Sequence, residues 1–252
     1  MVAGACRTHP SANPHPSLPV ARSVVLCAHP QLEHSRITQV LARAAASAGL
    51  ADVELRDLYA LYPDYPIDVP AEQAALADAA LLVWLHPVHW YGMTPMLKLW
   101  ADEVLAFGWA YGPGGTALRG KDLWLAVSTG GSAEAYRPDG LNRYFFDAFL
   151  PPYEQTAQLV GLRFLPPLVL HGAHRASEAE IETHVQTFAA RLASYPDWPE
   201  IEDLPACEAP EVPAGDRPSE ARCAPCSTSG GKKRMPVRAA VWSYGGKKAS
   251  KK

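Results

Sequence analysis

Long apolar runs are absent from this sequence of 252 residues. No stretch approaches the ~20 consecutive apolar residues that a membrane-spanning helix needs. No apolar segment of signal-peptide length lies near the N-terminus either, where four prolines among the first 22 residues disfavour a helix. We therefore expect an intracellular protein of the cytoplasm rather than a membrane-spanning or secreted one.

Cysteine and net charge are also scarce. Five cysteines cannot all pair with one another, so we expect reduced thiols rather than a disulfide framework. Lys and Arg number 23 against 26 Asp and Glu, a formal net charge of −3, which excludes a strongly basic nucleic-acid binder and predicts no specific nucleic-acid partner. Hydrophobic residues, in contrast, make up 48% of the chain, enough for a sizeable core.

Proline is unevenly distributed and indicates where the folded part lies. Half of the 24 prolines, and four of the five cysteines, fall in residues 1–22 and 196–252. Segments of this composition bury too little apolar surface to offset the entropy that ordering costs. We predict a disordered N-terminal tail over 1–22, one domain over 23–198 and a disordered C-terminal tail over 199–252.

The C-terminal tail is expected to be acidic first and basic at its end. Residues 196–220 carry eight acidic groups and one Arg, whereas residues 221–252 carry nine basic groups and no acidic one. Such an end is either simply solvated or makes weak contact with an anionic membrane face or with nucleic acid. The pair Cys223 and Cys226 looks like half of a zinc site, but a structural site needs four ligands, so no metal is predicted.

Short apolar runs alternate with segments of helical periodicity in the central part of the chain. The apolar runs predict strands over 22–28, 53–58, 80–86, 123–128 and 163–170. The periodic segments predict helices over 35–48, 71–78, 95–107, 141–160 and 177–194, the fourth interrupted at Pro151 and Pro152. This alternation predicts an α/β fold, a doubly wound five-stranded parallel sheet in the order 2-1-3-4-5 with helices on both faces.

Three unusual loops follow the first, third and fourth predicted strands. In such a sheet a ligand binds beyond the carboxyl ends of the strands, so all three loops are expected at the binding edge. The first loop, residues 28–38, has no glycine and is neither a P-loop nor a dinucleotide fingerprint. The helix N-terminus near Ser35 still offers free N–H groups to an anion, although such a loop is equally typical of a simply capped helix.

The second and third loops offer different chemistry. Residues 86–95 place Trp90 and Tyr91 directly after a buried strand, where they either cover a flat ligand or pack in the core or a dimer. Residues 128–132 contain two adjacent glycines, whose backbone N–H groups can point at a carbonyl edge. Phosphate donors, an aromatic wall and a donor-rich backbone edge are the parts that FMN needs, and no adenine site is evident, which favours FMN over FAD.

The motifs in these loops resemble those of a known family. They are Ala28-His29-Pro30 followed by Ser35, Pro87-Val88-His89-Trp90-Tyr91 followed by Leu97-Lys98-Leu99-Trp100, and Ser128-Thr129-Gly130-Gly131. The sequence resembles the flavodoxin-like NAD(P)H dehydrogenase (quinone) family, and within it the ancillary oxidoreductases of glutathione-regulated potassium-efflux systems. The narrower similarity rests on Leu61-Tyr62-Pro63-Asp64, Ile67-Asp68, Ala71-Glu72-Gln73, Gly108-Trp109-Ala110-Tyr111-Gly112 and Gly114-Gly115-Thr116-Ala117-Leu118.

The resemblance implies a flavodoxin-like fold and a set of cofactor-binding residues in the three loops. These are His29, Ser35, Arg36, Ile37, Thr38, Pro87, Val88, His89, Trp90, Tyr91, Ser128, Thr129, Gly130 and Gly131. It also implies a catalytic role for Tyr136 in hydride transfer. The family's partner histidine falls on Asn142 and is therefore missing, and Thr38 stands where asparagine is usual, a change that keeps a hydrogen-bond donor.

The function that the resemblance implies is that of an FMN-dependent NAD(P)H:quinone oxidoreductase, which passes hydride from NADH or NADPH through the flavin to a quinone. It also implies a homodimer and, as partner, the cytosolic domain of a potassium-efflux antiporter at the cytoplasmic face of the inner membrane. The alternatives are a mainly regulatory flavin- and nucleotide-binding subunit, an azo- or nitro-reductase, and a non-catalytic nucleotide-binding module. His86, His171 and His174 are interpreted as structural histidines rather than ligands.

Overall fold

The structure is a computed structural model that describes residues 22–47, 50, 52–207 and 209–210. All of them belong to the unit Met1–Gly215, and the second unit, Asp216–Lys252, contains none of them. The predicted N-terminal tail up to residue 21, the Cys223 and Cys226 pair and the basic end of the chain lie outside the described residues. No helix in the described part has the length and apolar character of a membrane span.

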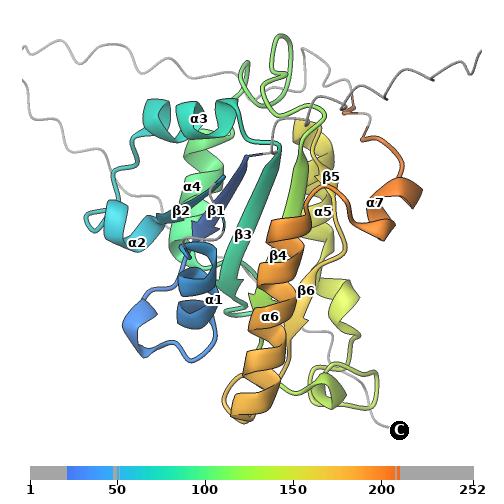
Figure 1. Cartoon of the computed structure of the whole chain (residues 1–252). Helices are drawn as coiled ribbons and strands as arrows, with labels where there is room; N and C mark the ends of the chain where they lie inside the picture. The colour runs from blue at the N-terminus through green and yellow to red at the C-terminus, as the bar shows by residue number, and fades with distance from the viewer. Residues whose placement is uncertain (1–21, 48–49, 51, 208, 211–252) are drawn as a thin grey trace, which may run out of the picture. The chain divides into compact units, whose positions relative to one another are not determined.

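A parallel sheet forms the centre of the domain (Figure 1). Its strands are β1 (Ser23–Cys27), β2 (Val53–Asp57), β3 (Leu81–Pro87), β4 (Asp122–Ser128), β5 (Arg163–Phe164) and β6 (Leu168–Leu170). They follow the order β2-β1-β3-β4-β5, and β6 also pairs with β4. The predicted fold class and strand order are therefore confirmed.

The register of the central strands brings the predicted binding loops together. Cys27 of β1 lies beside Leu85 of β3, and Pro87 at the end of β3 lies beside Ser128 at the end of β4. Because all pairings are parallel, the loops that follow β1, β3 and β4 leave the same end of the sheet. The winding of the chain reverses between β1 and β3, which is where a doubly wound sheet binds its ligand.

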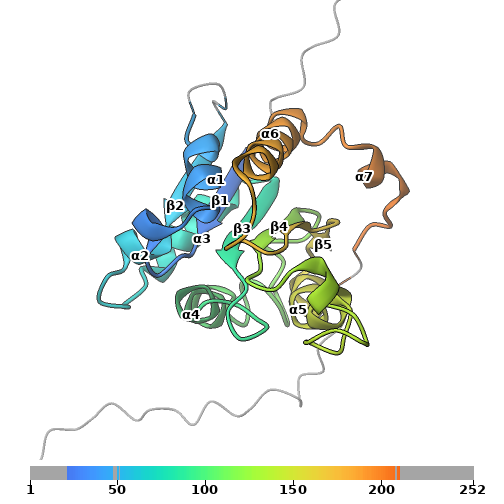
Figure 2. The same cartoon turned by 90° about the horizontal axis from the view of Figure 1, so that it is seen from below.

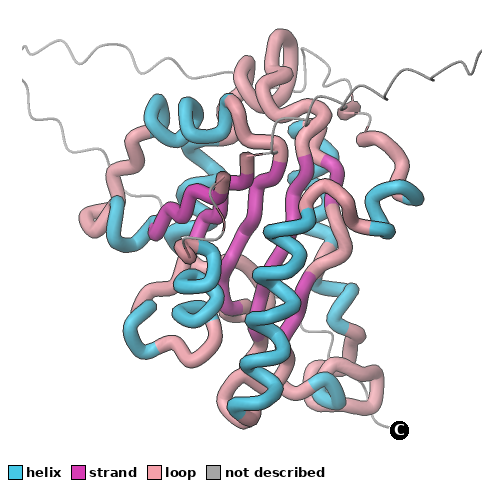
Figure 3. The backbone as a smooth tube through the Cα atoms, in the orientation of Figure 1, coloured by secondary structure: helices cyan, strands magenta, loops and turns pink. Residues whose placement is uncertain are grey.

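Helices cover both faces of the sheet, as the tube drawing makes clear (Figure 3). They are α1 (Thr38–Ala45), α2 (Leu58–Leu61), α3 (Val69–Ala77), α4 (Pro95–Val104), α5 (Pro151–Val160), α6 (Glu178–Ser194) and α7 (Pro199–Asp203). Short 3-10 turns lie at Leu32–His34, Ala133–Ala135 and Phe146–Phe149. In the view along the sheet, α1 and α6 lie side by side over one face, while α4 and α5 cover the other (Figure 2).

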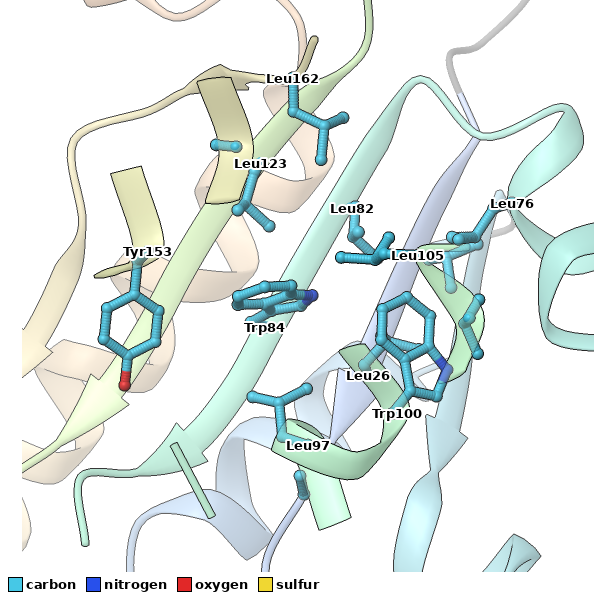
Figure 4. Close-up of a cluster of buried hydrophobic side chains, with 14 of the residues drawn as sticks. Leu26, Leu76, Leu82, Trp84, Leu97, Trp100, Leu105, Leu123, Tyr153 and Leu162 are labelled. Atoms are coloured by element: carbon cyan, nitrogen blue, oxygen red, sulfur yellow. The ribbon is translucent and has the colours of Figure 1, made fainter. Parts of the chain in front are cut away.

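Each face of the sheet has its own apolar cluster. On the α4 and α5 side, Trp84 of β3 and Trp100 of α4 are fully buried among leucines of the neighbouring strands (Figure 4). On the α1 and α6 side, Trp124 of β4 stacks on Phe188 of α6 with ring centroids 5.3 Å apart. The alternation of β-strand side chains explains the division, because neighbouring residues of one strand point to opposite faces.

One carboxylate is buried inside the cluster on the α4 side. Glu72 of α3 is fully buried and accepts hydrogen bonds from Arg56 Nη2 at 2.5 Å, from Trp100 Nε1 at 2.9 Å and from the Tyr62 hydroxyl. A buried charge is tolerated when it is paired and its remaining lone pairs accept hydrogen bonds. The network ties α3 to β2, to the segment after α2 and to α4, so Glu72 has a structural role.

Proline explains two differences between the predicted and observed elements. The helix predicted over 141–160 forms only as α5, and Pro151 and Pro152 occupy its first turn, where a missing N–H costs nothing, instead of breaking it. The strand predicted over 163–170 is divided into β5 and β6 around Pro166 and Pro167, which cannot donate to the β4 ladder.

Capping explains where other elements begin. The loop expected after the second strand contains α2, because Asp57 Oδ1 accepts from the N–H groups of Tyr59 and Ala60 at 3.2 and 3.3 Å. The final helix begins as predicted after Ser177, which forms a capping box with Glu180.

The C-terminal boundary of the folded part lies beyond the predicted residue 198. Trp198 is 2% exposed, and α7 follows it directly. Ile201 and Leu204 pack against the α1 and α6 cluster, and Arg191 pairs with Glu200 at 2.5 Å. The first part of the segment predicted as a tail therefore contributes to the domain.

Candidate cofactor and acceptor site

The loops after β1, β3 and β4 border one cavity of about 690 Å³, here called the main cavity. A fourth wall comes from the segment that follows β6. The lining residues are His29, Pro30, Gln31, His34, Ser35, Arg36, Ile37, Pro87, Val88, His89, Trp90, Ser128, Thr129, Gly130, Ala173 and His174. The structure thus brings together most of the residues that the resemblance implied for a cofactor.

Three of the implied residues lie outside the main cavity. Tyr91 and Gly131 line a neighbouring hollow of about 240 Å³, here called the side cavity. Thr38 is 1% exposed and lines neither cavity. Its backbone N–H donates to Ser35 Oγ at 3.0 Å, so Ser35 caps the start of α1 and Thr38 is a buried residue of its first turn.

The end of the main cavity next to α1 is suited to an anion. The backbone N–H groups of Arg36 and Ile37 donate no hydrogen bond to any described residue. Both lie just before the first turn of α1, where unpaired N–H groups and the helix dipole favour negative charge. The Ser35 hydroxyl adds a further donor beside them.

The side chain of Arg36 makes specific contacts within the protein. Its Nη2 donates to the carbonyl oxygen of Ala176 at 3.0 Å and to Glu178 Oε1 at 2.7 Å, and its Nη1 donates to the carbonyl oxygen of Ala173 at 3.3 Å. The guanidinium therefore ties the α1 loop to the segment before α6. It holds the fourth wall of the cavity in place while its charge stays near the anion end.

The aromatic wall stands on a tight turn after β3. His89 and Gly92 exchange backbone hydrogen bonds of 3.2 and 3.1 Å, and the two residues between them, Trp90 and Tyr91, have positive φ angles of 50° and 66°. Bulky side chains rarely adopt this conformation, and such strain concentrates at functional sites. Trp90 is 95% exposed, whereas the Tyr91 ring stacks on Phe149 at 5.1 Å.

The glycine-containing loop after β4 presents backbone donors to both cavities. Thr129 N donates to the Leu170 carbonyl oxygen at 2.9 Å and Gly172 N donates to the Gly131 carbonyl oxygen at 2.8 Å, which fix the loop against β6. The N–H groups of Gly130 and Gly131 donate to no described residue. A Cβ atom on Gly130 would lie 3.4 Å from His174 Nε2, so glycine keeps this edge of the cavity open.

Tyr136 lines the side cavity and is only 7% exposed. Burial raises the pKa of its phenol, and a hydrogen bond with the Thr129 hydroxyl acts in the opposite direction. Asn142 lines the same cavity, and its Oδ1 accepts from the Tyr91 hydroxyl at 3.4 Å. A phenol that keeps its proton can donate a hydrogen bond to a ligand oxygen, whereas Asn142 cannot exchange a proton.

The fourth wall was not found by sequence reasoning. His174 and Ala173 line the main cavity, although histidines of this segment were interpreted as structural. The signal was available, because the loop after the fifth predicted strand also leaves the carboxyl edge of the sheet.

Burial, reinforced by the nearby His89, lowers the pKa of His29 on the opposite wall, which leaves that imidazole neutral at pH 7.

Comparison with known proteins gives a consistent family. A family described as having a flavodoxin-like fold matches residues 21–192. A curated relative from Citrobacter koseri, the glutathione-regulated potassium-efflux system ancillary protein KefF, is 43% identical over 173 residues, which is 68% of this chain and 96% of the relative.

Solved structures show the same architecture. The general stress protein 14 of Treponema denticola, determined in complex with FMN, has 36% identity and a TM-score of 0.64, covering 69% of this chain and 98% of that one. A putative quinone reductase from Klebsiella pneumoniae has 25% identity and a TM-score of 0.59, covering 70% and 86%. On fold, sequence and site layout, the chain belongs to the flavodoxin-like family that includes the ancillary proteins of glutathione-regulated potassium-efflux systems.

Proposed function

We propose that this protein is an FMN-dependent NAD(P)H:quinone oxidoreductase that also serves as the ancillary subunit of a potassium-efflux antiporter. The main cavity carries the proposal, because unpaired backbone N–H groups occupy two of its walls and a strained aromatic turn stands between them. One end suits a phosphate and the other suits the carbonyl edge of a flat ring. The FMN-bound relative from Treponema denticola supports the choice of cofactor.

The residues of the main cavity fit FMN in chemical type. The N–H groups of Arg36 and Ile37, together with the Ser35 hydroxyl, would hold the phosphate. Trp90 and its neighbours in the turn would cover the ring, and the N–H groups of Gly130 and Gly131 would donate to its carbonyl edge. The glycine at position 130 leaves room for that approach, since a side chain there would meet His174.

FMN supplies the hydride chemistry when bound, and the protein supplies position and charge stabilisation. The fixed N–H groups of Gly130 and Gly131 stabilise negative charge on a carbonyl edge without reorganising, because β6 holds their loop. The side cavity adjoins the main cavity through Val88, Trp90 and Gly130, which line both. A quinone in the side cavity would have the Tyr136 hydroxyl as hydrogen-bond donor to its oxygen.

The potassium-efflux role is proposed from the curated relatives. The Citrobacter koseri protein is named an ancillary protein of a glutathione-regulated potassium-efflux system, and this chain covers 96% of it. The partner would be the cytosolic domain of the antiporter, which would bring the protein to the cytoplasmic face of the inner membrane. Co-elution of the protein with that isolated domain in gel filtration checks this part, and independent elution at micromolar concentrations of both would contradict it.

Cofactor uptake tests the enzymatic part directly. Purified protein should be yellow or become yellow with added FMN, release one FMN per chain on heating, and oxidise NADH or NADPH when a quinone is present. Gly130→Ala should weaken FMN binding, because its Cβ narrows the cavity beside His174. Gly92→Ala is the matched control, since its Cβ would meet nothing within 4 Å. A colourless protein that takes up no FMN overturns the proposal.

The same assay separates the alternative acceptors. An azo- or nitro-reductase would turn over azo dyes or nitroaromatics at higher kcat/KM than quinones. A mainly regulatory subunit would bind FMN and nucleotide yet turn over slowly with every acceptor. The exposed apolar residues around the side cavity, Trp90, Tyr91 and Leu141, favour a flat apolar acceptor and are compatible with a quinone.

A further inference from the structure

The side cavity has room for the ring of an acceptor and for little more. Its volume of about 240 Å³ lies below the roughly 300–1,000 Å³ of pockets that enclose a drug-sized ligand. The described residues that line it include no Asp, Glu, Lys, Arg or His, so the cavity offers no charged group to a polar substituent. A long substituent on a ring bound there has to lie outside the cavity, on the neighbouring surface.

The surface on one side of the cavity is rich in large apolar side chains. Tyr91, Leu141, Tyr144 and Phe145 are between 50% and 86% exposed. Together with the partly buried Phe149 they are here called the apolar strip. Single exposed apolar side chains are normal on a protein surface, whereas a contiguous group of them beside a cavity indicates a binding surface.

Ring contacts make the apolar strip continuous with the cavity wall. The Phe149 ring stacks on Tyr91 at 5.1 Å and lies edge-on to Tyr144 at 6.3 Å. It also lies edge-on to Tyr136, with centroids 5.8 Å apart. Tyr91, Tyr136 and Leu141 all line the side cavity. The strip therefore begins at the wall of the cavity and continues outward as far as Tyr144.

The backbone holds the apolar strip in a fixed conformation. Asn142 N donates to the Ala135 carbonyl oxygen at 2.9 Å, and Arg143 N donates to the Gly140 carbonyl oxygen at 3.2 Å. A Cβ atom on Gly140 would lie 2.3 Å from the Glu134 carbonyl oxygen, so this turn packs directly on the preceding one. Arg143 has a φ angle of 61°, a strained conformation of the kind that concentrates at functional sites. A surface that is already ordered loses little entropy when a ligand binds.

We propose that the apolar strip is the subsite for a hydrocarbon chain on the acceptor, so that the substrate class is a quinone that carries such a chain. The inference rests on the proposed quinone reductase function and deepens it. The ring would lie in the side cavity near the Tyr136 hydroxyl, and the chain would leave the cavity beside Leu141 and lie along the strip. Continuity with the cavity favours this occupant over a separate protein, because a chain bonded to the ring has to pass over this surface.

A chain bound in this way affects affinity and leaves the chemistry unchanged. One hydride from NAD(P)H and one solvent proton still convert each quinone to its quinol, and the chain does not react. Because the chain lies away from the reacting oxygens, the protein binds it equally before and during the reaction, which lowers KM without raising kcat. Removing about two methylene groups from water accounts for roughly a tenfold gain in affinity.

Two quinones with the same dimethoxy-methyl-benzoquinone ring, one with a decyl chain and one without, test the subsite. The wild type should show a KM about tenfold lower for the decyl quinone, with the two kcat values within twofold. Tyr144→Ser and Leu141→Ser should each reduce that KM ratio to about threefold, and the double variant should bring it near one. Tyr65→Ser is the matched control, because Tyr65 is 52% exposed and lines neither cavity, and it should keep the tenfold ratio.

Equilibrium binding gives a readout that does not depend on turnover. In FMN-loaded protein without NAD(P)H, fluorescence quenching should give a Kd about tenfold lower for the decyl quinone, and the same variants should reduce that ratio. Equal Kd values in the wild type, or a tenfold ratio kept in the double variant, would overturn the proposal.

Light scattering on the same proteins checks the oligomeric state. Tyr144→Ser and Leu141→Ser should leave it as in the wild type, and dissociation of a wild-type oligomer would assign the apolar strip to a contact between copies and overturn the subsite. Binding with the expected ratio but no turnover of either quinone would instead contradict the proposed function and leave the subsite standing.

Discussion

Burial sets the titration of the ionisable side chains around the site. It lowers the pKa values of His29 and His171 and raises that of Tyr136. All three are consequently neutral at pH 7, so they act as N–H and O–H groups, while the Arg36 guanidinium keeps a positive charge near the anion end of the main cavity. Such donors stabilise developing negative charge on a bound ring or acceptor.

Tyr136→Phe tests the donor role at the acceptor. Removing only the hydroxyl keeps the ring contacts with Phe146 and Phe149, so FMN content and melting temperature should stay near wild type. Quinone turnover should fall about 10- to 100-fold, toward the lower end of what general acids contribute. Steady-state kinetics with flavin quantification measure both effects. Turnover equal to wild type would show that the hydroxyl has no part in the limiting step.

His86→Phe tests the cost of a buried neutral histidine. Burial lowers the pKa of His86 from 6.5 to about 4, while its ring stacks on Tyr153 at 5.8 Å. The unfolded chain therefore binds the proton first, and stability present above pH 6.5 is lost as the pH falls toward 4. Between pH 7 and 5 the wild type should lose roughly 2 kcal/mol more than His86→Phe, which keeps an aromatic ring.

Urea unfolding at the two pH values measures that difference. His34→Gln is the control, because the His34 side chain is 75% exposed and its removal should leave the wild-type pH dependence intact. An identical pH slope in His86→Phe and wild type would mean that the buried ring accepts a proton without penalty.

Among the elements, the turn after β3 has a strained backbone that destabilises the fold and exposes an aromatic surface. Trp90 and Tyr91 both have positive φ, a conformation that costs a bulky residue roughly 1–2 kcal/mol. Trp90 gains no burial within the protein in return, since it is 95% exposed. The side chain and its backbone strain are therefore explained together if a ligand covers the ring.

Trp90→Gly separates the two contributions. Glycine adopts positive φ freely, so the flavin-free variant should be more stable by about 1 kcal/mol while its FMN affinity falls at least about tenfold. Trp90→Ala keeps the strain and removes the ring, so it should lose the affinity without the gain in stability. Thermal unfolding and FMN titration give both values. Unchanged affinity in both variants would remove Trp90 from the cofactor site.

Sequence periodicity predicted elements well where local signals agreed with the fold. The buried strands β1, β3 and β4 were found because both of their faces are covered, which requires continuous apolar runs. It failed at prolines, whose effect depends on their place in the fold. Pro151 starts α5 instead of breaking a helix, and Pro166 divides the last predicted strand into β5 and β6. The distinction depends on which backbone N–H groups the fold needs, and that is set by tertiary neighbours.

At the scale of the whole molecule, the site is assembled from segments that are far apart in the chain. Three of its four walls carry motifs that could be recognised, and their convergence followed from the parallel sheet. The fourth wall, with Ala173 and His174, carries no motif. Arg36 holds it by a contact 137 residues apart in sequence, and the β4 loop holds the neighbouring His171 by a contact 42 residues apart. The burial of Thr38 likewise depended on a helix start that periodicity places only approximately.

The folded unit extends past residue 198. Trp198 is buried, and α7 beyond it adds contacts of Ile201 and Leu204 with the core. Burying these two side chains contributes roughly 2 kcal/mol if each is partly enclosed. The boundary predicted at residue 198 would therefore remove part of the stability of the domain, although no residue of either cavity lies beyond it.

Two truncations decide the boundary. A protein of residues 20–210 should melt within a few degrees of the full chain, whereas one of residues 20–198 should melt about 4–8 °C lower, as roughly 2 kcal/mol predicts for a domain of this size. The loss has a second source, because Glu200 pairs with Arg191 of α6. Both truncated proteins should keep FMN and quinone turnover at 25 °C, since the four walls are intact. Calorimetry and flavin content measure these outcomes. Equal melting of the two would show that α7 adds nothing, and loss of FMN from residues 20–210 would show that a tail supports the site.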